Sequence, residues 1–153
     1  MGHKEVLNLI EIRERDLVRD ISNEEEIGIS KVRRIIATFL TSIKNQVLLG
    51  KRVRIKGLGT FYLQQGFEGR PKIFFVDTSD EFDLDIELLR SDLVNLVSLK
   101  ENLSKNIVDR VIKSFIYKLH KIDSSNETRI SFKDFGFFII KDHHIQYVPF
   151  DQR

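Results

Sequence analysis

The sequence predicts an α+β protein built from two tandem units, each with two helices followed by a three-stranded antiparallel sheet. Three observations support this prediction: an internal repeat, a long amphipathic helix pattern in each half, and a change of hydrophobic period from 3.6 to 2 after each long helix. The chain has 153 residues, of which 41% are hydrophobic and 12 are Phe, so it has enough apolar material for a packed core.

The internal repeat covers both the helical and the strand parts of the two halves. Residues 16–21 recur as residues 92–97, and residues 55–61 recur as residues 132–138, with a single insertion between the two registers. Six apolar positions on one face of the long helix also recur: Val32, Ile35, Ile36, Phe39, Leu40 and Ile43 become Val108, Val111, Ile112, Phe115, Ile116 and Leu119. We interpret this agreement as a duplication, because chance does not match so many apolar positions.

Each copy predicts a short helix, at residues 14–23 and 86–99, and then a longer one, at residues 30–48 and 104–122. Ser30 and Ser104 are the predicted N-caps of the long helices, since their hydroxyls can accept from early helical N–H groups. Gly50 is placed to end the first long helix.

The strands follow each long helix. Residues 52–56 and 129–133 alternate polar and apolar side chains, and residues 72–77 and 145–150 fit a third strand. Gly59 and Gly136 interrupt the pattern between them, which predicts a bulge or a close approach of the backbone. The acidic run 77–83 is the predicted join. We therefore divide the chain into an N-terminal extension (1–12), copy 1 (13–80) and copy 2 (81–153), and the apolar content of the extension suggests docking.

Charge divides the chain unevenly. Residues 1–76 hold 14 Lys and Arg against 9 Asp and Glu, a net charge of +5, whereas residues 77–153 hold 11 against 14, a net charge of −3. This is either ordinary surface scatter or a molecule with two oppositely charged ends, suited to head-to-tail contacts. There is no Cys, no long apolar segment that would span a membrane, and no secretory signal, because Glu5 and Glu11 interrupt the N-terminus.

Two motifs resemble the HU/IHF family of bacterial DNA-bending proteins. Residues 103–105 (Leu-Ser-Lys) open a long helix, and residues 56–61 (Lys-Gly-Leu-Gly-Thr-Phe) are similar to the family's Gly-Phe-Gly-Thr-Phe segment, with Leu58 in place of its first Phe. Copy 2 keeps only Gly136 and Phe138 of that segment. The resemblance implies dimerisation through the helices and sheets, and a long basic β-arm whose tip proline kinks DNA from the minor groove.

The predicted arms are shorter than the family's. Only the segment 62–72 separates Phe61 from Ile73, and it ends in Gly-Arg-Pro-Lys at positions 69–72. In copy 2 the still shorter segment 141–144 separates the corresponding strands, without Arg or Pro. The two copies form either an internal pseudo-dimer or contacts with copies in a neighbouring chain, and the sequence leaves both arrangements open.

The candidate nucleic-acid-binding residues are basic, apart from one proline: Arg52, Arg54, Lys56, Arg70, Pro71 and Lys72. On a strand, Arg52, Arg54 and Lys56 share one face and could follow phosphates. The alternative is a solvated sheet face or a contact for an acidic protein surface. Arg33 and Arg34 are interpreted as solvent-exposed.

No catalytic residue, cofactor-binding residue, metal ligand or small-molecule substrate is predicted, so we do not expect an enzyme. His143 and His144 are adjacent, and neighbouring residues of a strand point to opposite faces, so they are poorly placed to share a metal ion. The glycine-rich segment 57–60 lacks the Lys and Ser or Thr of a phosphate loop. The Phe residues are interpreted as core and interface packing rather than base-stacking groups. Apolar runs on both faces of the strands indicate that helices cover one side and a partner the other.

Two functions follow. In the first, the chain is a structural protein that uses the duplicated fold for assembly with protein partners and as a homo-oligomer, similar to the IHF-like virion proteins of crAss-like bacteriophages, where it would serve in a tail or connector ring. The alternative is an architectural DNA-binding protein of the HU/IHF type. The expected location is the virion or the host cytoplasm.

Overall fold

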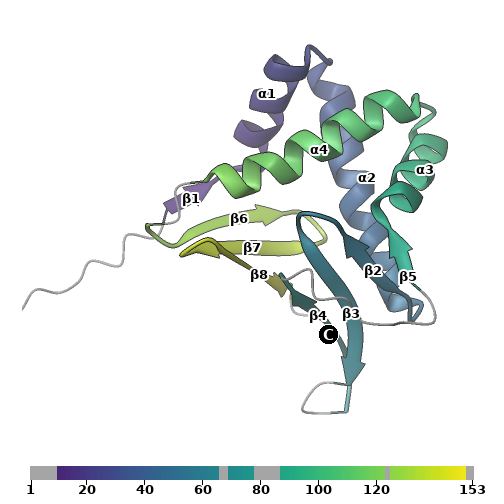
Figure 1. Cartoon of the computed structure of the whole chain (residues 1–153), viewed down its shortest axis with the longest axis vertical. Helices are drawn as coiled ribbons and strands as arrows, with labels where there is room; N and C mark the ends of the chain where they lie inside the picture. Colours follow the sequence, from purple (N-terminus) through teal and green to yellow (C-terminus); the bar gives the residue numbers. More distant parts are fainter. Residues whose placement is uncertain (1–9, 66–68, 78–86, 123–124, 151–153) are drawn as a thin grey trace, which may run out of the picture.

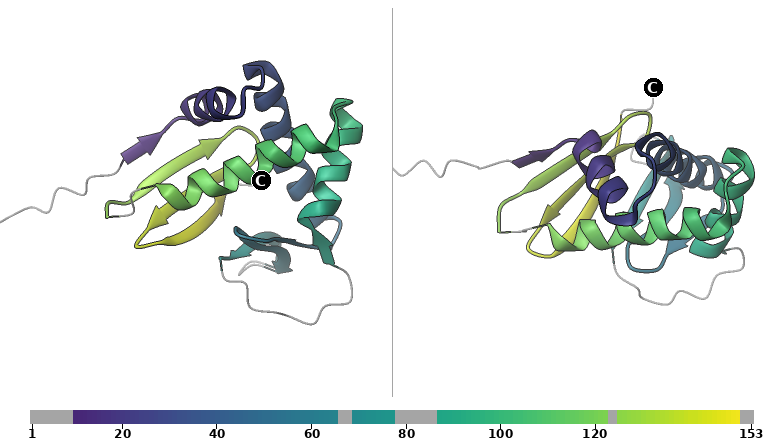
Figure 2. Two further views of the ribbon diagram at one scale, coloured as in Figure 1. Left: turned by 45° about the horizontal axis from the view of Figure 1, so that its top comes forward. Right: turned by 90° about the horizontal axis from the view of Figure 1, so that it is seen from above.

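The computed structural model describes residues 10–65, 69–77, 87–122 and 125–150. It is an α+β fold in which a layer of helices covers one side of two four-stranded sheets (Figures 1 and 2), so the predicted fold class is confirmed. The elements in chain order are β1 (Ile10–Ile12), α1 (Glu14–Glu25), α2 (Ile29–Leu48), β2 (Arg52–Ile55), β3 (Gly59–Gln65), β4 (Pro71–Val76), β5 (Glu87–Leu89), α3 (Arg90–Glu101), α4 (Lys105–Lys121), β6 (Thr128–Phe132), β7 (Gly136–Lys141) and β8 (His144–Pro149).

The chain contains two units with the same element order, which we call unit 1 (β1 to β4) and unit 2 (β5 to β8). Local details recur between them. The first helix of each unit ends at a residue in the left-handed conformation, Glu26 (φ 56°) in unit 1 and Asn102 (φ 54°) in unit 2. The hydroxyls of Ser22 and Ser98 each donate to a carbonyl in the turn that follows, those of Ile27 and Leu103, at 2.6 and 2.5 Å. The two units therefore share their turn chemistry as well as their hydrophobic pattern.

The two units exchange their first strands. The sheets have the orders β1-β6-β7-β8 and β4-β3-β2-β5, and β1 of unit 1 pairs in parallel with β6 of unit 2, while β5 of unit 2 pairs in parallel with β2 of unit 1. Each sheet thus has three antiparallel strands from one unit and one parallel strand from the other. The units pack on each other within one chain as an internal pseudo-dimer, one of the two arrangements that the sequence leaves open.

Ion pairs between the units follow the same approximate symmetry. Arg34 of unit 1 lies 3.4 Å from Glu101 of unit 2, and Arg110 of unit 2 lies 3.2 Å from Glu25 of unit 1. In the repeat, Arg34 is equivalent to Arg110 and Glu25 to Glu101, so the two ion pairs are copies of each other. Because these pairs are partly exposed to solvent, we expect them to align the units rather than to supply much stability.

A single hydrophobic core joins the two units. The rings of Phe39 on α2 and Phe115 on α4 meet edge to face at 6.3 Å, and these two residues occupy equivalent positions. The interpretation of the Phe residues as core is confirmed for Phe61, Phe132, Phe135 and Phe138, which are all buried. In the described part of the chain, no helix is both long and apolar enough to cross a membrane.

The predicted cap of the first long helix is wrong. Helix α2 begins at Ile29 with Gly28 as its N-cap, so Ser30 lies inside the first turn. Ser104 does cap α4, where its hydroxyl accepts from the N–H of Ile107 at 3.3 Å. Gly28 is the equivalent of Ser104 in the repeat, so the repeat itself places the cap at the glycine. Gly50 follows the end of α2 with φ of 91°, as predicted.

The helix predicted at residues 86–99 begins later, at Arg90. Residues 87–89 form β5 instead, because they pair with β2 and Leu88 packs against the core. Residues 10–12, which we predicted as part of an extension, form β1 and dock on β6. Within the predicted acidic join 77–83, only Asp77 is among the described residues.

Gly59 and Gly136 mark close approaches of the backbone, as predicted. A Cβ atom at Gly59 would lie 2.4 Å from the carbonyl oxygen of Val76, and one at Gly136 would lie 2.4 Å from that of Val148. Both glycines also have positive φ, 152° and 140°. Each begins the middle one of three antiparallel strands, β3 or β7, so a side chain there would push β4 or β8 away.

Candidate nucleic-acid interface

The outer face of the sheet β4-β3-β2-β5 is the side that points away from the helices. Val53 and Ile55 of β2 are buried in the core, so the alternating residues Arg52 and Arg54 lie on the outer face. The Arg52 guanidinium is 5.2 Å from the centre of the Tyr62 ring on β3. This contact holds the cation over an aromatic face while both groups remain half-buried.

Aromatic and basic side chains continue across the outer face onto β4. Tyr62 pairs with Phe74, and their rings stack at 5.9 Å with an angle of 23° between the planes. Phe74 is 37% exposed, and Lys72 lies two positions earlier on the same face. The outer face therefore combines positive charge with flat apolar surface, which suits contact with a nucleic-acid backbone.

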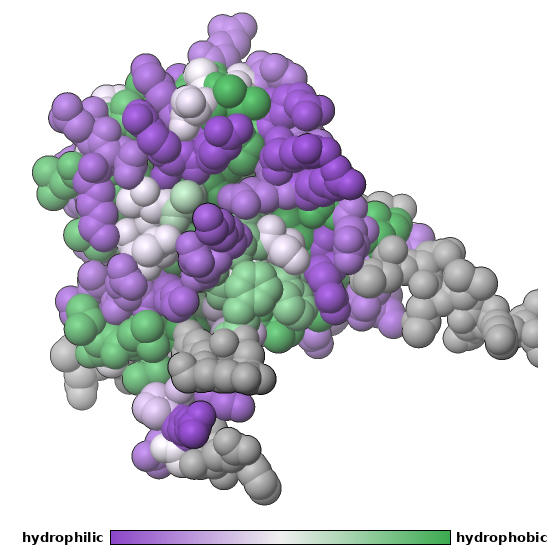
Figure 3. Space-filling view, turned by 180° about the vertical axis from the view of Figure 1, so that it is seen from behind, coloured by the Kyte–Doolittle hydropathy of each residue, from purple (hydrophilic) through white to green (hydrophobic). Residues whose placement is uncertain are grey.

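The β3–β4 hairpin extends beyond the body of the molecule. The two strands stay paired as far as Gln65 and Pro71, and the side chains of Gln64, Arg70 and Lys72 are exposed. The hairpin points away from the helices (Figure 1), and its projecting end is hydrophilic whereas apolar side chains gather on the body above it (Figure 3). From Thr60 to Gln65 the strand rises roughly 17 Å at 3.3 Å per residue, so the hairpin is a short arm.

The equivalent hairpin of unit 2 has no such extension. Strands β7 and β8 are joined by Asp142 and His143, whose φ angles of 51° and 64° form a tight turn. Lys141 and His144 close this turn as a pair, and the His144 ring lies 3.4 Å from the Asp77 carboxylate of unit 1. The two arms are therefore unequal, as the spacing of the sequence predicts.

The six predicted residues occupy three places. Arg52, Arg54 and Lys72 share the outer face, and Arg70 and Pro71 lie at the far end of the hairpin. Lys56 does not share the strand with Arg52 and Arg54, because β2 ends at Ile55. It is exposed in the turn between β2 and β3.

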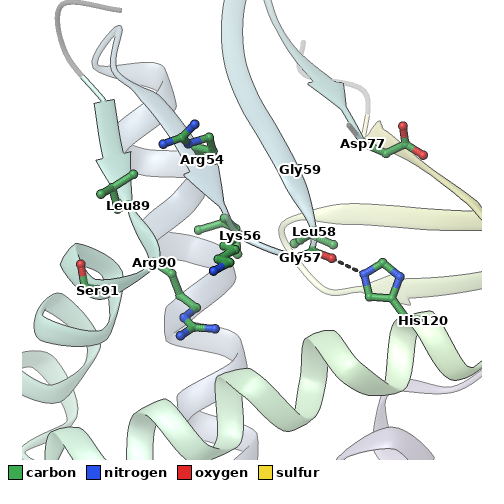
Figure 4. A pocket seen from close by; sticks show the side chains of 11 residues that line it. Arg54, Lys56, Gly57, Leu58, Gly59, Asp77, Leu89, Arg90, Ser91 and His120 are labelled. Atoms are coloured by element: carbon green, nitrogen blue, oxygen red, sulfur yellow. Dashed lines mark hydrogen bonds between the residues drawn. The ribbon is translucent and has the colours of Figure 1, made fainter. Parts of the chain in front are cut away.

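A cavity of about 780 Å³, which we call the junction pocket, opens where this turn meets unit 2. Its charged and ionisable lining comprises Arg54, Lys56, Asp77, Arg90 and His120 (Figure 4). The His120 ring donates a hydrogen bond to the carbonyl of Gly57 across the junction. Sequence reasoning missed Arg90 and His120. The internal repeat could have drawn attention to Arg90, because Arg90 occupies the position that corresponds to the oppositely charged Glu14.

The described residues contain no group of three or more His, Asp or Glu side chains that could hold a metal ion. Burial raises the pKa of Tyr147, whose hydroxyl donates to the carbonyl of Phe135 at 2.6 Å, so this tyrosine is a buried structural group. The arrangement of charges and aromatic rings supports binding of an anion or a polyanion.

Residues 12–70 match the family model described as "Bacterial DNA-binding protein". The matched segment runs from the end of β1 to Arg70 in the hairpin, so it includes the outer-face residues of β2 and β3. A comparison with curated proteins finds no match for the chain. Residues 12–70 are therefore similar to bacterial DNA-binding proteins, which supports the predicted resemblance to the HU/IHF type over this part of the chain.

Proposed function

We propose that this chain is a non-enzymatic architectural DNA-binding protein, which binds duplex DNA through the outer face and the hairpin of unit 1. The observation that carries the proposal is a coincidence of two independent features. The segment that matches bacterial DNA-binding proteins also holds Arg52 and Arg54 of the outer face, strand β3 of the projecting hairpin and Arg70 at its end. Unit 2 lacks the match and has the tight, short turn.

The proposed contacts are electrostatic. Arg52, Arg54 and Lys72 on the outer face, with Arg70 at the end of the hairpin, would neutralise phosphates and release counterions. Pro71 is exposed at the first position of β4, beside two cations. Because the hairpin is short and its counterpart has no basic extension, we infer one-sided binding with a smaller bend than two long arms would produce.

The repeat supports an origin of the two units by duplication. Under this proposal the boundaries expected from the sequence, 1–12, 13–80 and 81–153, separate two copies that act as the two subunits of a dimer. The pseudo-dimer makes a second chain unnecessary for folding, because each sheet is completed by the other unit of the same chain.

The experiment is fluorescence anisotropy of the purified chain with a labelled duplex of about 30 base pairs, at low and at near-physiological salt. We expect binding that weakens steeply as salt rises, because each neutralised phosphate contributes a slope of about −0.9 to the dependence of log K on log salt. Binding that is absent at low salt would refute the proposal.

The double variant Arg70→Glu with Lys72→Glu tests where the DNA lies. Both side chains are exposed, so the change should not affect folding. We expect at least a tenfold loss of affinity and a salt slope reduced by about 2, one unit for each lost phosphate contact. The matched control, Lys100→Glu with Lys105→Glu, changes the charge equally near the end of α3 and the start of α4, on the opposite side of the molecule from the hairpin (Figure 1). Equal losses in the two variants would show only a general charge effect.

A second candidate function is the assembly role, with the virion of a bacteriophage as its setting. One observation favours it: large apolar side chains, Phe74 and Phe150, are exposed beside a groove of about 500 Å³ between β4 and β8. Such a surface suits a protein partner or a second copy. Under this function the anisotropy experiment would show no binding at physiological salt, and light scattering would show a species larger than one chain. The DNA-binding proposal takes precedence because the family match favours it.

A further inference from the structure

The two places where the units join have the same backbone plan. In each, the turn after the first antiparallel strand of one unit meets the helices of the other unit. Lys44 of α2 donates through Nζ to the carbonyl of Asp134 at 3.0 Å, and His120 of α4 donates through its ring to the carbonyl of Gly57. Lys44 and His120 occupy equivalent positions of the repeat, and so do Gly57 and Asp134. The junctions can therefore be compared group by group.

At the junction formed by the turn of unit 2, the chain supplies its own oxyanion. Glu14 begins α1, and its carboxylate accepts a hydrogen bond from the backbone N–H of Lys133. Burial raises the pKa of Glu14, while the nearby Arg33 and the hydrogen bond from Lys133 act in the opposite direction. The N–H of Lys133 and the charge of Arg33 thus favour the ionised carboxylate, while burial, the larger effect, opposes its ionisation.

At the other junction the charges of the Glu14 and Arg33 positions are reversed. Arg90 stands where Glu14 stands, and Asp109 stands where Arg33 stands, at 3.9 Å from Arg90. Lys56 takes the place of Lys133 in the turn. A guanidinium only donates hydrogen bonds, so Arg90 cannot provide the acceptor that Glu14 provides at the first junction.

The reversed junction also has room, because it contains the junction pocket of about 780 Å³. In Figure 4, Arg54 and Arg90 lie near Lys56 at the start of the turn, and His120 lies beside Gly57 further along it. Two acidic groups lie nearby. Asp77 accepts from the backbone N–H of Ile145 at 3.0 Å, and Asp109 is shared between Lys113, at 3.0 Å, and Arg90, at 3.9 Å.

We propose that the junction pocket binds a small molecule that carries an oxyanion group, a phosphate or a carboxylate, in the place that the Glu14 carboxylate occupies at the other junction. Arg90 and Lys56 would hold the oxyanion, since Arg forms paired hydrogen bonds with such groups. Ile55, Leu58 and Leu89 line the rest of the pocket and provide apolar contact for the remainder of the molecule. The pocket volume lies within the usual range for small-molecule sites, about 300–1,000 Å³.

The test is isothermal titration of inorganic phosphate, and separately of glutarate, into the full chain at low ionic strength without DNA. We expect one site per chain for at least one of the two probes. Preference for phosphate or for glutarate identifies the oxyanion. If neither probe binds at millimolar concentration, the proposal is overturned.

The decisive variant is Arg90→Glu, which places a carboxylate at the position that corresponds to Glu14 at the other junction. We expect at least a tenfold weaker affinity for the probe, because an internal carboxylate then repels or replaces it. Lys31→Glu, an exposed change of the same charge on α2, should bind the probe like the wild type. If Arg90→Glu does not give a cooperative thermal transition, Arg90→Gln serves instead with the same expected loss. Unchanged binding in the folded Arg90 variant would overturn the proposal.

The proposal does not depend on DNA binding, and the variants separate the two. The chain with Arg70→Glu and Lys72→Glu should still bind the probe, whether or not it binds DNA. Arg90→Glu should lose the probe and keep at least half of the duplex affinity of the Lys31→Glu control. If Arg90→Glu loses the duplex and the probe together, the pocket is a seat for a DNA phosphate and the proposal of a small-molecule ligand is overturned.

Discussion

Units 1 and 2 have the same order of helices and strands, yet they differ at the two surfaces available to a ligand. The hairpin of unit 1 carries Arg70 and Lys72 on a projecting arm, whereas that of unit 2 closes at Asp142 and His143. The junction at the turn of unit 1 is cationic and open, and the junction at the turn of unit 2 is occupied by Glu14.

The residues that the two units share are those that the fold requires, and the residues that differ include those proposed to bind a ligand. Positions that pack or close a turn are equivalent in both units, such as Phe39 with Phe115 and Gly59 with Gly136. Exposed positions differ freely because surface substitutions change stability little. A pseudo-dimer in one chain can therefore specialise one half for a ligand, which a dimer of identical subunits cannot do.

The shared core gives the largest expected effect. Phe39→Ala and Phe115→Ala should each lower the free energy of unfolding by about 3–5 kcal/mol, because both rings are fully buried and each leaves a cavity. Urea unfolding followed by circular dichroism should show one transition in the wild type. The two variants should shift its midpoint by similar amounts.

A single unfolding transition is not expected if the two units fold independently of each other. Two separate transitions, with each variant moving only one of them, would contradict a single core and the exchange of β1 and β5. Leu99→Ala provides the control, since Leu99 is 79% exposed and its loss should leave the midpoint nearly unchanged.

A smaller effect is expected from a hydrogen bond that unit 2 has and unit 1 lacks. Tyr147 faces Phe138 in its sheet as Phe75 faces Phe61, but only Tyr147 has a hydroxyl, which donates to the buried carbonyl of Phe135 at 2.6 Å. Tyr147→Phe makes unit 2 like unit 1 at this position. The substitution should lower the free energy of unfolding by about 1 kcal/mol, because the buried Phe135 carbonyl loses its hydrogen-bond donor and has no access to water.

Differential scanning calorimetry can measure this loss against Tyr117→Phe, a change at a side chain that is 60% exposed and should have no effect. An equally small change in both variants would mean that water replaces the lost bond. The hydroxyl would then not distinguish the units.

The sequence predicts much of the fold because its strongest signals come from the core. The six repeated apolar positions of the long helix, including Phe39 and Phe115, are all buried, and the period change locates β2 and β6. The missed elements, β1 and β5, are very short strands whose partners belong to the other unit. No local pattern reveals such pairing, so short exchanged strands depend on tertiary structure.

The candidate site was predictable only in part, for a related reason. Charge and alternation identify Arg52 and Arg54 on one face, because these are local properties of a strand. The junction pocket brings together Lys56, Arg90 and His120, which are distant in sequence and come from both units. Arg90 becomes informative only when the repeat is aligned and its charge is compared with that of Glu14.

The smallest expected effect is the contribution of Glu14, which is present at one junction only, to the pH dependence of folding stability. Burial raises the pKa of Glu14 in the folded chain above its value in the unfolded chain. Between these two pKa values the folded state binds more protons than the unfolded state, so stability falls as the pH rises through the window that begins near the ordinary Glu value of about 4.3. Glu14→Gln removes this term but keeps an oxygen that can accept from the N–H of Lys133.

Urea midpoints measured from pH 4 to pH 7 should therefore decline less in Glu14→Gln than in the wild type, with Glu11→Gln on β1 as the variant of equal charge. At pH 7 the Glu14→Gln chain should be at least as stable as the wild type, since the desolvated charge is gone. A chain that is clearly less stable at pH 7 would show that the ionised carboxylate gains more from Lys133 and Arg33 than it loses by burial. In that case the position that the Glu14 carboxylate occupies beside Lys133 is favourable for a full negative charge.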